Sequence, residues 1–288
     1  MNSAREITLA LGGKWHGRYG TACCPTHEDR NPSLSIAGGR DGCLLVKCHA
    51  GCDPLDVLAA LREKGHSVRQ VESTLAREAT HREEQSAWRA RQQAKAQSEW
   101  AKARPIGGTL GEQYLRNRSI RGDLPKTLRF NPNCWHPSAT RPPAIVAKVE
   151  RGNALVGVHR TYLGPDGGKA DLSPNKAMLG PVKGGAVQLS DGAGPLIVAE
   201  GIETALSVLE MNAAHWPRVW AALSAGGVAG LQLPDTPSDL IVSPDGDKAG
   251  REAAEKLAIR AHALGWLVSV LAAPDGKDWN DVAMEAAR

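Results

Sequence analysis

The sequence has few tyrosines and no long apolar segment. Only three tyrosines occur among its 288 residues, at positions 19, 114 and 162, and none lies in a recognisable catalytic context, which argues against a tyrosine nucleophile. No apolar run approaches the roughly 18 residues that a transmembrane helix needs, so we expect no membrane partner. Residues 1–20 lack the apolar core of a signal peptide, which predicts a cytoplasmic protein.

Two further patterns are missing. No Gly-x-x-x-x-Gly-Lys-[Ser/Thr] loop occurs, so the sequence contains no P-loop helicase motor. Residues 67–104 have neither Gly nor Pro, and they also lack a sustained heptad of Leu or Ile. Their content of Ala, Gln, Glu and Arg therefore predicts an exposed helical linker, one helix or two from about Val68 to Ala103, rather than a coiled coil.

Two acidic motifs near the C-terminus carry most of the functional information. They are Val198-Ala-Glu-Gly-Ile-Glu-Thr-Ala-Leu-Ser207 and Ile241-Val-Ser-Pro-Asp-Gly-Asp-Lys-Ala-Gly250. Each is an apolar run that ends in acid and continues into a predicted helix, which places Glu200, Asp245 and Asp247 at the carboxyl edge of a parallel sheet, where ligands bind. Because Mg²⁺ is held by carboxylates and substrate phosphates, the motifs predict a metal-dependent phosphoryl-transfer site. The alternative is that the acids only cap helices.

These motifs resemble the Toprim domain, which is shared by bacterial and phage primases, topoisomerases and some nucleases. The resemblance covers residues 191–288. It implies that Glu200, Asp245 and Asp247 are catalytic and bind Mg²⁺ or Mn²⁺, one ion or two. It also implies that Asp278, in a third acidic motif, is a further ligand of this metal.

The sequence departs from the family pattern at two positions. Thr204, next to Glu203, stands where many bacterial primases carry Asp. Asn280 stands where a second acid is common, with Asp281 beside it. These departures leave the number of metal ions open, and the role of Glu200, as metal ligand or as base, is open as well.

Apolar runs also predict the secondary structure of this region. Strands alternate with helices, which favours a parallel, Rossmann-like sheet. The predicted strands are residues 196–199, 218–223, 240–243 and 267–272, and the predicted helices are residues 202–211, 227–233 and 248–264.

A cysteine cluster near the N-terminus predicts a metal site of a different kind. Six cysteines in a cytoplasmic chain favour metal binding or free thiols over disulfides. Cys24-Pro-Thr-His27 and Cys48-His-Ala-Gly-Cys52 are spaced as two zinc-ligand pairs, and four tetrahedral Cys and His ligands make a structural zinc site. The segment between them predicts a hairpin, and a helix is expected to start at Asp53.

The two pairs, together with Asp29-Arg-Asn-Pro-Ser-Leu-Ser-Ile36, resemble the zinc-binding domain of bacterial and phage primases, a small zinc ribbon. The second pair has three intervening residues where the bacterial pattern has two, a spacing found in phage and plasmid primases. The resemblance implies one structural zinc ion held by Cys24, His27, Cys48 and Cys52. His49 remains an alternative to either cysteine of the second pair, and Cys23 an alternative to Cys24.

Residues 105–190 form a basic segment between the two sites. They hold 12 Lys and Arg against 5 Asp and Glu, whereas residues 191–288 hold 7 against 14. A basic surface beside a metal site suits a phosphate-rich polymer, although it could also be an ordinary solvated face. The predicted elements, which indicate a mixed α+β subdomain, are a helix at residues 111–118 and strands at residues 128–130, 144–149 and 155–163.

This basic segment also resembles part of a known family. Val158-His-Arg-Thr-Tyr-Leu163, Gly168-Lys-Ala170 and Asn175-Lys-Ala-Met-Leu-Gly180 are similar to the segment before Toprim in phage-type primases, a polymerase subdomain whose basic groove faces the metal site. The resemblance implies that template or nucleotide phosphates contact Arg160, Lys169, Lys176 and Lys183. Each of these could instead be a surface residue without a ligand.

Together these features predict an α/β protein of four parts. They are an N-terminal zinc ribbon (1–66), a helical linker (67–104), a mixed α+β basic subdomain (105–190) and a C-terminal Toprim domain (191–288). The resemblance, closest to phage or plasmid primases, implies a DNA primase, a DNA-dependent RNA polymerase that makes short RNA primers on single-stranded DNA by metal-assisted nucleotidyl transfer. A Toprim nuclease and a non-catalytic DNA-binding module of a replication initiator are the alternatives. A topoisomerase would need the tyrosine nucleophile.

The same resemblance implies the partners. They are a single-stranded DNA template, ribonucleoside triphosphates and a replicative helicase, either separate or a C-terminal part missing from this chain. We expect one structural Zn²⁺ and one or two catalytic Mg²⁺ or Mn²⁺ ions. A bacterial cytoplasm is the expected location, with the protein encoded by a phage or plasmid. The ribbon is expected to read template bases, with Trp15, His16 and Tyr19 as candidates.

Overall fold

The computed structural model describes residues 3–29, 31–39, 43–68 and 72–287, with only the backbone described for residues 72–81. The chain divides into two compact units, Met1–Ser86 and Ala87–Arg288. Among the helices in the described ranges, none combines the length and the apolar character that a membrane span requires.

The first unit is a small antiparallel sheet with two helices. Its strands follow the order β1-β2-β3-β4, and alternate residues of β3, Leu34 and Ile36, are buried with Ile7, Val57 and Leu61 in one small core. The expected hairpin and following helix are confirmed, whereas the first helix and strands were not predicted. The elements are α1 Ala4–Ala10, β1 Lys14–Trp15, β2 Tyr19–Ala22, β3 Leu34–Gly38, β4 Leu44–Cys48 and α2 Pro54–Glu63.

Helix α3, Glu72–Lys102, confirms the helix predicted for the linker. From Ala87 onward it belongs to the second unit, and there it is not wholly exposed as expected. Ala96 is buried, and the Gln93 side chain donates a hydrogen bond of 2.7 Å to the carbonyl oxygen of Leu155. The end of α3 is therefore part of a packed core.

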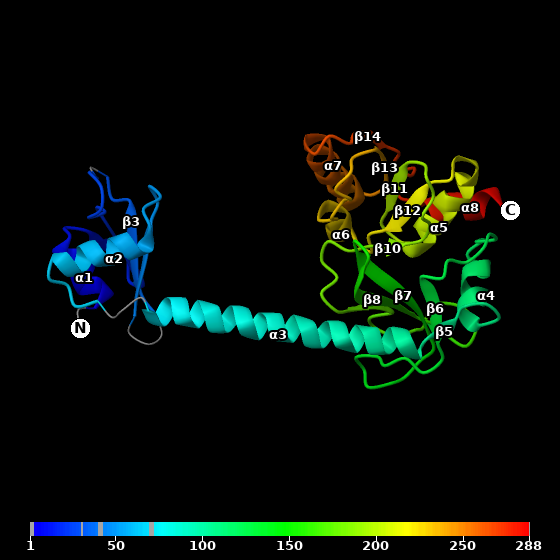
Figure 1. The fold of residues 1–288 in the computed structure, drawn as a ribbon, viewed down its shortest axis with the longest axis horizontal. Helices are drawn as coiled ribbons and strands as arrows, with labels where there is room; N and C mark the ends of the chain where they lie inside the picture. Colours follow the sequence, from blue (N-terminus) through cyan, green and yellow to red (C-terminus); the bar gives the residue numbers. More distant parts are fainter. Residues whose placement is uncertain (1–2, 30, 40–42, 69–71, 288) are drawn as a thin grey trace. The chain divides into compact units, whose positions relative to one another are not determined.

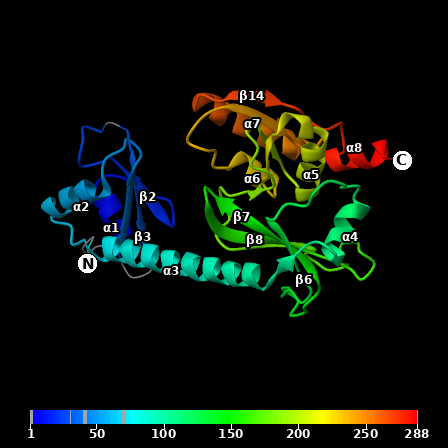
Figure 2. The same ribbon diagram turned by 45° about the vertical axis from the view of Figure 1, so that its right-hand side comes forward.

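The first sheet of the second unit is antiparallel throughout, in the order β5-β6-β7-β8-β9. The two faces of this sheet pack against different partners. Ile145 and Ala147 of β7 pack with the C-terminal sheet, whereas Val146 packs with the end of α3. Figures 1 and 2 show α3 on one side of this sheet and the C-terminal sheet on the other. The elements are β5 Arg104–Pro105, α4 Leu110–Asn117, β6 Leu128–Asn131, β7 Ala144–Arg151, β8 Ala154–Tyr162 and β9 Lys176–Leu179.

The second sheet has the order β10-β12-β11-β13-β14. The four predicted strands are present and parallel, but β10 adds an antiparallel edge next to β12 that was not predicted. The helix expected at 227–233 is shorter and begins earlier. The elements are β10 Val187–Gln188, β11 Leu196–Ala199, α5 Ile202–Met211, a 3-10 helix Ala213–His215, β12 Arg218–Ala221, α6 Ala225–Ala229, β13 Asp239–Ser243, α7 Lys248–Ala263, β14 Leu267–Val270 and α8 Trp279–Ala286.

One apolar cluster joins the two sheets of the second unit. It contains Leu128 and Ile145 from the antiparallel sheet, and Ile197, Ile202 and Val219 from the region of the parallel sheet. This core is formed by apolar side chains from both sheets and from α5. It fixes the carboxyl edge of β11 and β13 relative to the strands that carry the predicted basic residues.

Candidate active site and metal centre

The first unit gathers the four predicted zinc ligands. One ligand atom of each of Cys24, His27, Cys48 and Cys52 lies within 4.8 Å of all the others, and no other such group of three or more His, Cys, Asp or Glu occurs among the described residues. His27 Nδ1 and Cys52 Sγ are 3.1 Å apart. His49, the open alternative, is instead hydrogen-bonded to Ser35 at 2.9 Å. A Cys₃His set at this spacing fits a tetrahedral zinc ion.

Asp29 supports the first ligand pair from behind, a role that sequence reasoning missed. Its carboxylate accepts hydrogen bonds from the backbone N–H of Cys24, at 2.8 Å, and from the hydroxyl and N–H of Ser33. His27 Nε2 lies 3.8 Å from the same carboxylate. The hydrogen bonds of Ser33 and Cys24 lower the pKa of Asp29 to about 2. A carboxylate behind a ligating histidine orients its ring, so Asp29 is placed to fix His27.

The pKa values of two thiols in this centre are shifted in opposite directions. Burial alone raises the pKa of Cys48, but hydrogen bonds from the Cys52 N–H and the Ser33 hydroxyl outweigh it and lower this pKa to about 6. Burial raises the pKa of Cys24. A bound cation favours the thiolate of both, because only deprotonated cysteine ligates zinc.

The predicted catalytic acids lie at the carboxyl edge of the parallel sheet. Strands β11 and β13 are adjacent and in register, with Ala199 beside Ser243, so Glu200 and Asp245 leave the sheet at the same edge. Asp247 is the N-cap of α7 and accepts a hydrogen bond of 2.7 Å from the Gly250 N–H. Helix capping, the alternative reading of these acids, is thus true of Asp247.

Asp278 joins this edge from the segment after β14. It is the N-cap of α8, and its carboxylate accepts a hydrogen bond of 2.8 Å from the Asp281 N–H. The Asp281 carboxylate in turn accepts a hydrogen bond from the Asp278 N–H, so the two acids form a capping box. Asn280 points elsewhere: it is fully buried and donates to the Arg118 carbonyl at 2.7 Å and to Ser207 at 3.0 Å. Of these two, Asp281 is the one near the other acids.

The electrostatics of the edge centre on Asp245. Burial, then Glu200, Asp278, Asp247 and Asp281, raise the pKa of Asp245 to about 7. Its Oδ1 is buried with no hydrogen-bond partner. Burial and Asp247 also raise the pKa of Glu200. Repelling carboxylates with an unpartnered oxygen fit a hard divalent cation, although their oxygens are not gathered as closely as the cysteine-site atoms.

Glu203 behaves in the opposite way, and sequence reasoning noted it only as a neighbour of Thr204. It is 5% exposed, accepts a hydrogen bond of 2.6 Å from the Tyr114 hydroxyl and pairs with Lys176 Nζ at 3.1 Å. Burial alone would raise the pKa of Glu203, but Lys176 and Tyr114 lower it to about 2. The signal in the sequence is a charged residue on a helix that is otherwise buried, Ile202–Val208.

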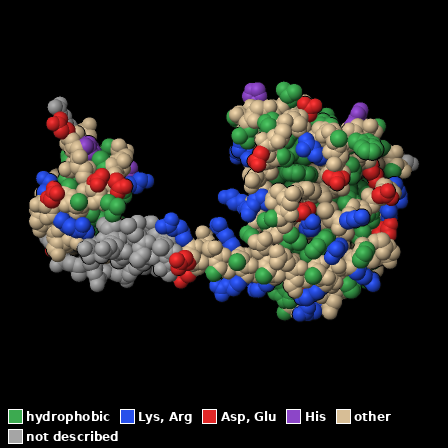
Figure 3. Space-filling view, in the orientation of Figure 1, with side chains coloured by type: hydrophobic (Ala, Val, Ile, Leu, Met, Phe, Trp, Pro, Cys, Tyr) green, Lys and Arg blue, Asp and Glu red, His purple; other side chains and the backbone are tan. Residues whose placement is uncertain are grey.

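Three of the four predicted phosphate contacts lie outside the core. Lys176 is partly exposed beside Glu203, and Lys169 is exposed. The pKa of Lys169 is lowered, first by the protein atoms that screen it from water and then by Lys176, with Glu203 and Asp278 acting against this. Lys183 is exposed in the loop after β9. On the face seen in Figure 3, basic and acidic side chains of the second unit are interspersed.

Arg160 does not lie with these lysines. It is 3% exposed, and its Nη1 donates a hydrogen bond of 2.9 Å to the carbonyl oxygen of Trp135. Along β8, Val158 and Tyr162 pack with α3. His159 lies on the other face: burial first, and then the nearby Lys176, lower the pKa of its imidazole to about 4. Because strand residues alternate, Arg160 belongs to the α3 face and Lys176 to the opposite face. Its assignment to the same groove as Lys176 therefore needs correction.

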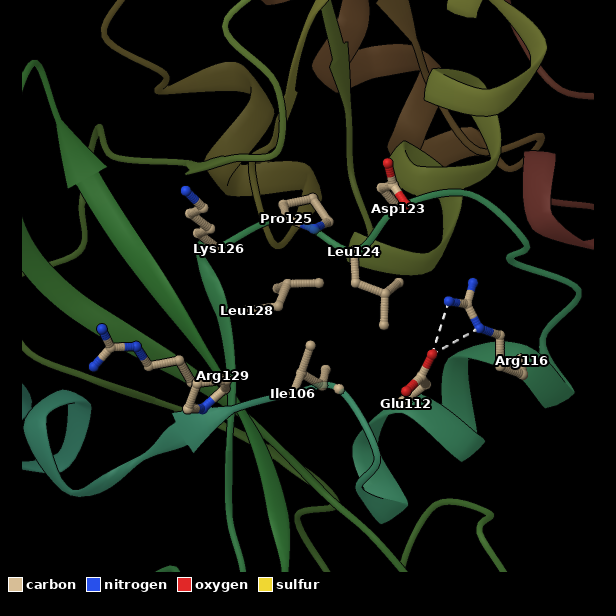
Figure 4. A pocket seen from close by; sticks show the side chains of 11 residues that line it. Ile106, Glu112, Arg116, Asp123, Leu124, Pro125, Lys126, Leu128 and Arg129 are labelled. Carbon is tan, nitrogen blue, oxygen red and sulfur yellow. Dashed lines mark hydrogen bonds and ion pairs between the residues drawn. The ribbon is translucent and has the colours of Figure 1, made fainter.

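A cavity of about 530 Å³ opens beside α4 and β6. Its floor is apolar, with Ile106, Leu124 and Leu128, and its charged pair Glu112 and Arg116 is closed on itself at 2.8 Å (Figure 4). None of the predicted site residues lines it. This cavity is separate from the predicted site residues, and its other charged lining residues are Asp123, Lys126 and Arg129.

The fold is similar to solved structures of primase domains. The RNA polymerase domain of Mycobacterium tuberculosis primase DnaG matches with a TM-score of 0.45 and 19% identity, over 68% of this chain and 79% of that one. The zinc-binding and RNA polymerase domains of Aquifex aeolicus primase match with a TM-score of 0.40 and 16% identity, over 99% and 83%. The primase fragment of the bacteriophage T7 primase-helicase protein matches with a TM-score of 0.39 and 16% identity, over 64% and 70%. Such scores do not establish an activity.

Family comparison is more specific. No curated protein matches the sequence. Residues 90–189 match a domain of unknown function, DUF7146, and residues 195–288 match the Toprim domain. The second match contains Glu200, Asp245 and Asp278, the acids that the structure brings to one sheet edge. Residues 195–288 of this chain therefore form a Toprim domain.

Proposed function

We propose that the chain is a DNA primase, which synthesises short RNA primers on single-stranded DNA by metal-assisted nucleotidyl transfer. The observation that carries this proposal is the carboxylate edge of the Toprim domain. There Asp245 has a buried oxygen without a partner and a pKa raised to about 7 among other acids. Groups that repel one another in this way are stabilised by a cation and are costly without one.

The acids would divide the work at this edge. Glu200, Asp245, Asp247 and Asp278 would hold Mg²⁺ or Mn²⁺, which when bound stabilises negative charge on the attacking and leaving oxygens of the transfer. The raised pKa of Glu200 suits a group that accepts the proton of a 3′-hydroxyl. Asp247, which caps α7, presents its carboxylate from a fixed position.

Lys176 and Lys169 would bind the phosphates of the incoming nucleotide or the template, with Lys183 further out. The Lys176 ammonium is anchored by buried Glu203, which in turn is held by Tyr114. Glu203 would therefore act as a positioning residue: it fixes the direction of Lys176 while leaving its ammonium partly exposed, at 33%. A lysine on a flexible stem loses less entropy on binding phosphate when it is held in advance.

The first unit would read the template. The chain would then consist of a zinc ribbon (1–66), a helical linker (67–104), a basic subdomain (105–190) and the Toprim domain (191–288). The rings of His16 and Tyr19 stack with centroids 5.1 Å apart, and both side chains are exposed. Aromatic surfaces of this kind can stack on single-stranded bases. The partners would be single-stranded DNA, ribonucleoside triphosphates and a replicative helicase, in the cytoplasm of a bacterium that carries the phage or plasmid.

The test is incubation of the full chain with single-stranded templates of varied sequence, labelled ribonucleotides and Mg²⁺ or Mn²⁺. We expect short, template-dependent RNA products that disappear in Asp247→Asn. Shortening of the template without RNA synthesis would instead support a Toprim nuclease. Template binding with neither reaction would support a non-catalytic module of a replication initiator.

A further inference from the structure

A second cavity lies between α3 and the face of sheet β5–β9 that is turned away from the Toprim carboxylates. Its volume is about 350 Å³, near the lower end of the roughly 300–1,000 Å³ typical of small-molecule sites. The residues that matter for its chemistry are Lys95, Ser98, Glu99, Lys102, Trp135 and Arg160. All of them belong to the second unit.

Arg160 forms the base of this cavity and is short of partners. It is 3% exposed, yet its Nε is buried without a hydrogen bond. Its Nη1 donates a hydrogen bond to the Trp135 carbonyl. Its guanidinium also interacts with the Cys134 thiol and lies 5.7 Å from the centroid of the Tyr162 ring, but it forms no ion pair with a carboxylate of the described residues. A buried charge without an opposite charge is costly in free energy. The guanidinium therefore lacks an anion.

The rest of the cavity complements such an anion. Lys95 and Lys102 are exposed on α3, and the one acid among the lining residues, Glu99, is already paired with Lys102 at 2.8 Å. Trp135 is 45% exposed, and its ring centroid lies 5.8 Å from the Arg160 guanidinium carbon. A planar cation, the Lys95 ammonium, the Lys102–Glu99 pair and a half-exposed tryptophan thus meet in one small space, with cations in excess of acids.

We propose that this cavity binds one nucleotide unit, with its phosphate on Arg160 and the two lysines and its base stacked on Trp135. Arginine suits phosphate because its planar fork gives two parallel hydrogen bonds. Bases of any sequence stack on tryptophan. The volume accommodates a single unit, which a free nucleotide or one residue of a nucleic acid strand could supply.

This site is distinct from the proposed catalytic one. Arg160 and Lys176 sit on opposite faces of the same sheet, as the partners of β8 show. A nucleotide bound at Arg160 would lie on the α3 side and would not touch Glu200 or Asp245. The site would therefore bind without a divalent cation, and its occupation does not depend on whether the Toprim edge catalyses primer synthesis.

The test is titration calorimetry of the full chain in EDTA, in an Asp245→Asn background that disables the carboxylate edge. The probes are a nucleoside monophosphate, a short single-stranded oligonucleotide and inorganic phosphate. We expect saturable nucleotide binding. Trp135→Ala should weaken it about tenfold or more, the size of one base-stacking contact, and Lys95→Ala/Lys102→Ala should weaken it as well. Both variants change exposed side chains and should fold.

A matched control is Lys126→Ala/Arg141→Ala, which removes two exposed cations of the same unit outside the cavity and should leave binding unchanged. Stronger binding of the oligonucleotide than of the monophosphate would identify a strand as the source, and equal binding a free nucleotide. Inorganic phosphate that binds as tightly as the nucleotide would overturn the proposal. So would affinities that Trp135→Ala and the lysine pair leave unchanged, since Arg160 would then serve only to pack α3.

Discussion

The two metal-site regions of this chain solve opposite electrostatic problems. In the first unit, one ligand atom of each of the four residues lies within 4.8 Å of the others, and the Asp29 carboxylate accepts hydrogen bonds from the N–H groups of Cys24, one of the four, and of Ser33. At the Toprim edge, hard carboxylates stand beside one another, and Asp245 has an oxygen without a partner. In the first region the ligand atoms are already close enough to bind an ion. In the second, the carboxylates repel one another, and a bound cation would reduce this repulsion.

The difference follows from the size of the core behind each site. The first unit buries only a few apolar side chains around Leu34 and Ile36, so a bound metal adds directly to its folding free energy. The Toprim edge rests on the large cluster around Ile197 and Val219. Such a core can hold repelling acids in place without a metal. The contrast is the one expected between a structural metal centre and the catalytic one that we propose.

The largest expected effect is on the cysteine centre. Cys48→Ser should remove the zinc and unfold the ribbon, because structural zinc contributes about 10–16 kcal/mol in comparable small domains. Elemental analysis and protease sensitivity of residues 1–66 would measure both losses. Cys43→Ser is the matched control and should keep full zinc content. Retention of zinc and of protease resistance in Cys48→Ser would contradict the assignment.

The next effect is on the carboxylate edge, where a substitution should lower activity without lowering stability. Asp245→Asn should lower primer synthesis at least about 100-fold, because it removes a group that holds charge-stabilising metal. Its metal-free thermal stability should stay equal or rise, since repulsion with Glu200 and Asp278 is relieved. Primer assays and thermal melts in EDTA would test both halves. A large loss of stability would show that Asp245 is structural.

A smaller effect is expected behind the zinc ligands. Asp29→Asn should weaken zinc binding about 10- to 100-fold, as loss of a supporting carboxylate does at other metal sites. Competition with a chromophoric chelator would measure the affinity. Glu28→Gln, a neighbouring exposed acid, is the control and should have no effect. If both variants hold zinc equally well, Asp29 does not orient His27.

Glu203 offers a test within the Toprim domain. Glu203→Gln keeps a partner for Tyr114 but removes the charge that anchors Lys176, and we expect about a tenfold rise in the KM for nucleotide with a smaller change in kcat. A structural role alone would lower stability without this split. Steady-state kinetics together with thermal melts separate the two cases. An unchanged KM would remove Glu203 as a positioning residue.

The smallest effect is on the pH dependence of stability, where the two regions should differ in sign. Burial and neighbouring acids raise the pKa of Asp245 to about 7. Its neutral form thus favours the fold below the ordinary pKa, and this contribution is lost as the pH rises through about 7. Ser33 and Cys24 lower the pKa of Asp29 to about 2, so its contribution is lost as the pH falls toward that value. Thermal melts of the unaltered chain in EDTA, from pH 4 to 8, should show stability falling as the pH rises through about 7. The Asp245→Asn variant should not show this fall.

Much of the candidate site was readable because its signals are local. The spacing of Cys24 to His27 and of Cys48 to Cys52 gave the cysteine centre, and acids after apolar runs gave Glu200 and Asp245. Strand β11 and helix α5 begin and end where the apolar pattern predicted. Such signals depend only on residues near one another in sequence, and the hydrogen-bonded period of a strand or helix converts them into position.

Partners that come from distant segments were decided by the tertiary structure. Glu203 is hydrogen-bonded to Tyr114 and Lys176, which lie 89 and 27 residues away in the sequence. The local sequence around a buried acid on an apolar helix does not indicate which distant cation pairs with it. Residues 187–188 join the parallel sheet as an antiparallel edge because of a pairing with Trp220 and Ala221.

Arg160 shows the same division most clearly. Its charge and its sequence neighbours are known from the sequence, and they predicted that Arg160 lies beside Lys176 in one groove. The alternation of β8 puts His159 and Arg160 on opposite faces, but only the packing of α3 against one face and of the Toprim domain against the other says which face is which. Sequence thus determined the chemistry of each side chain. The tertiary structure, in which both faces of the sheet are buried, determined which residues each side chain contacts.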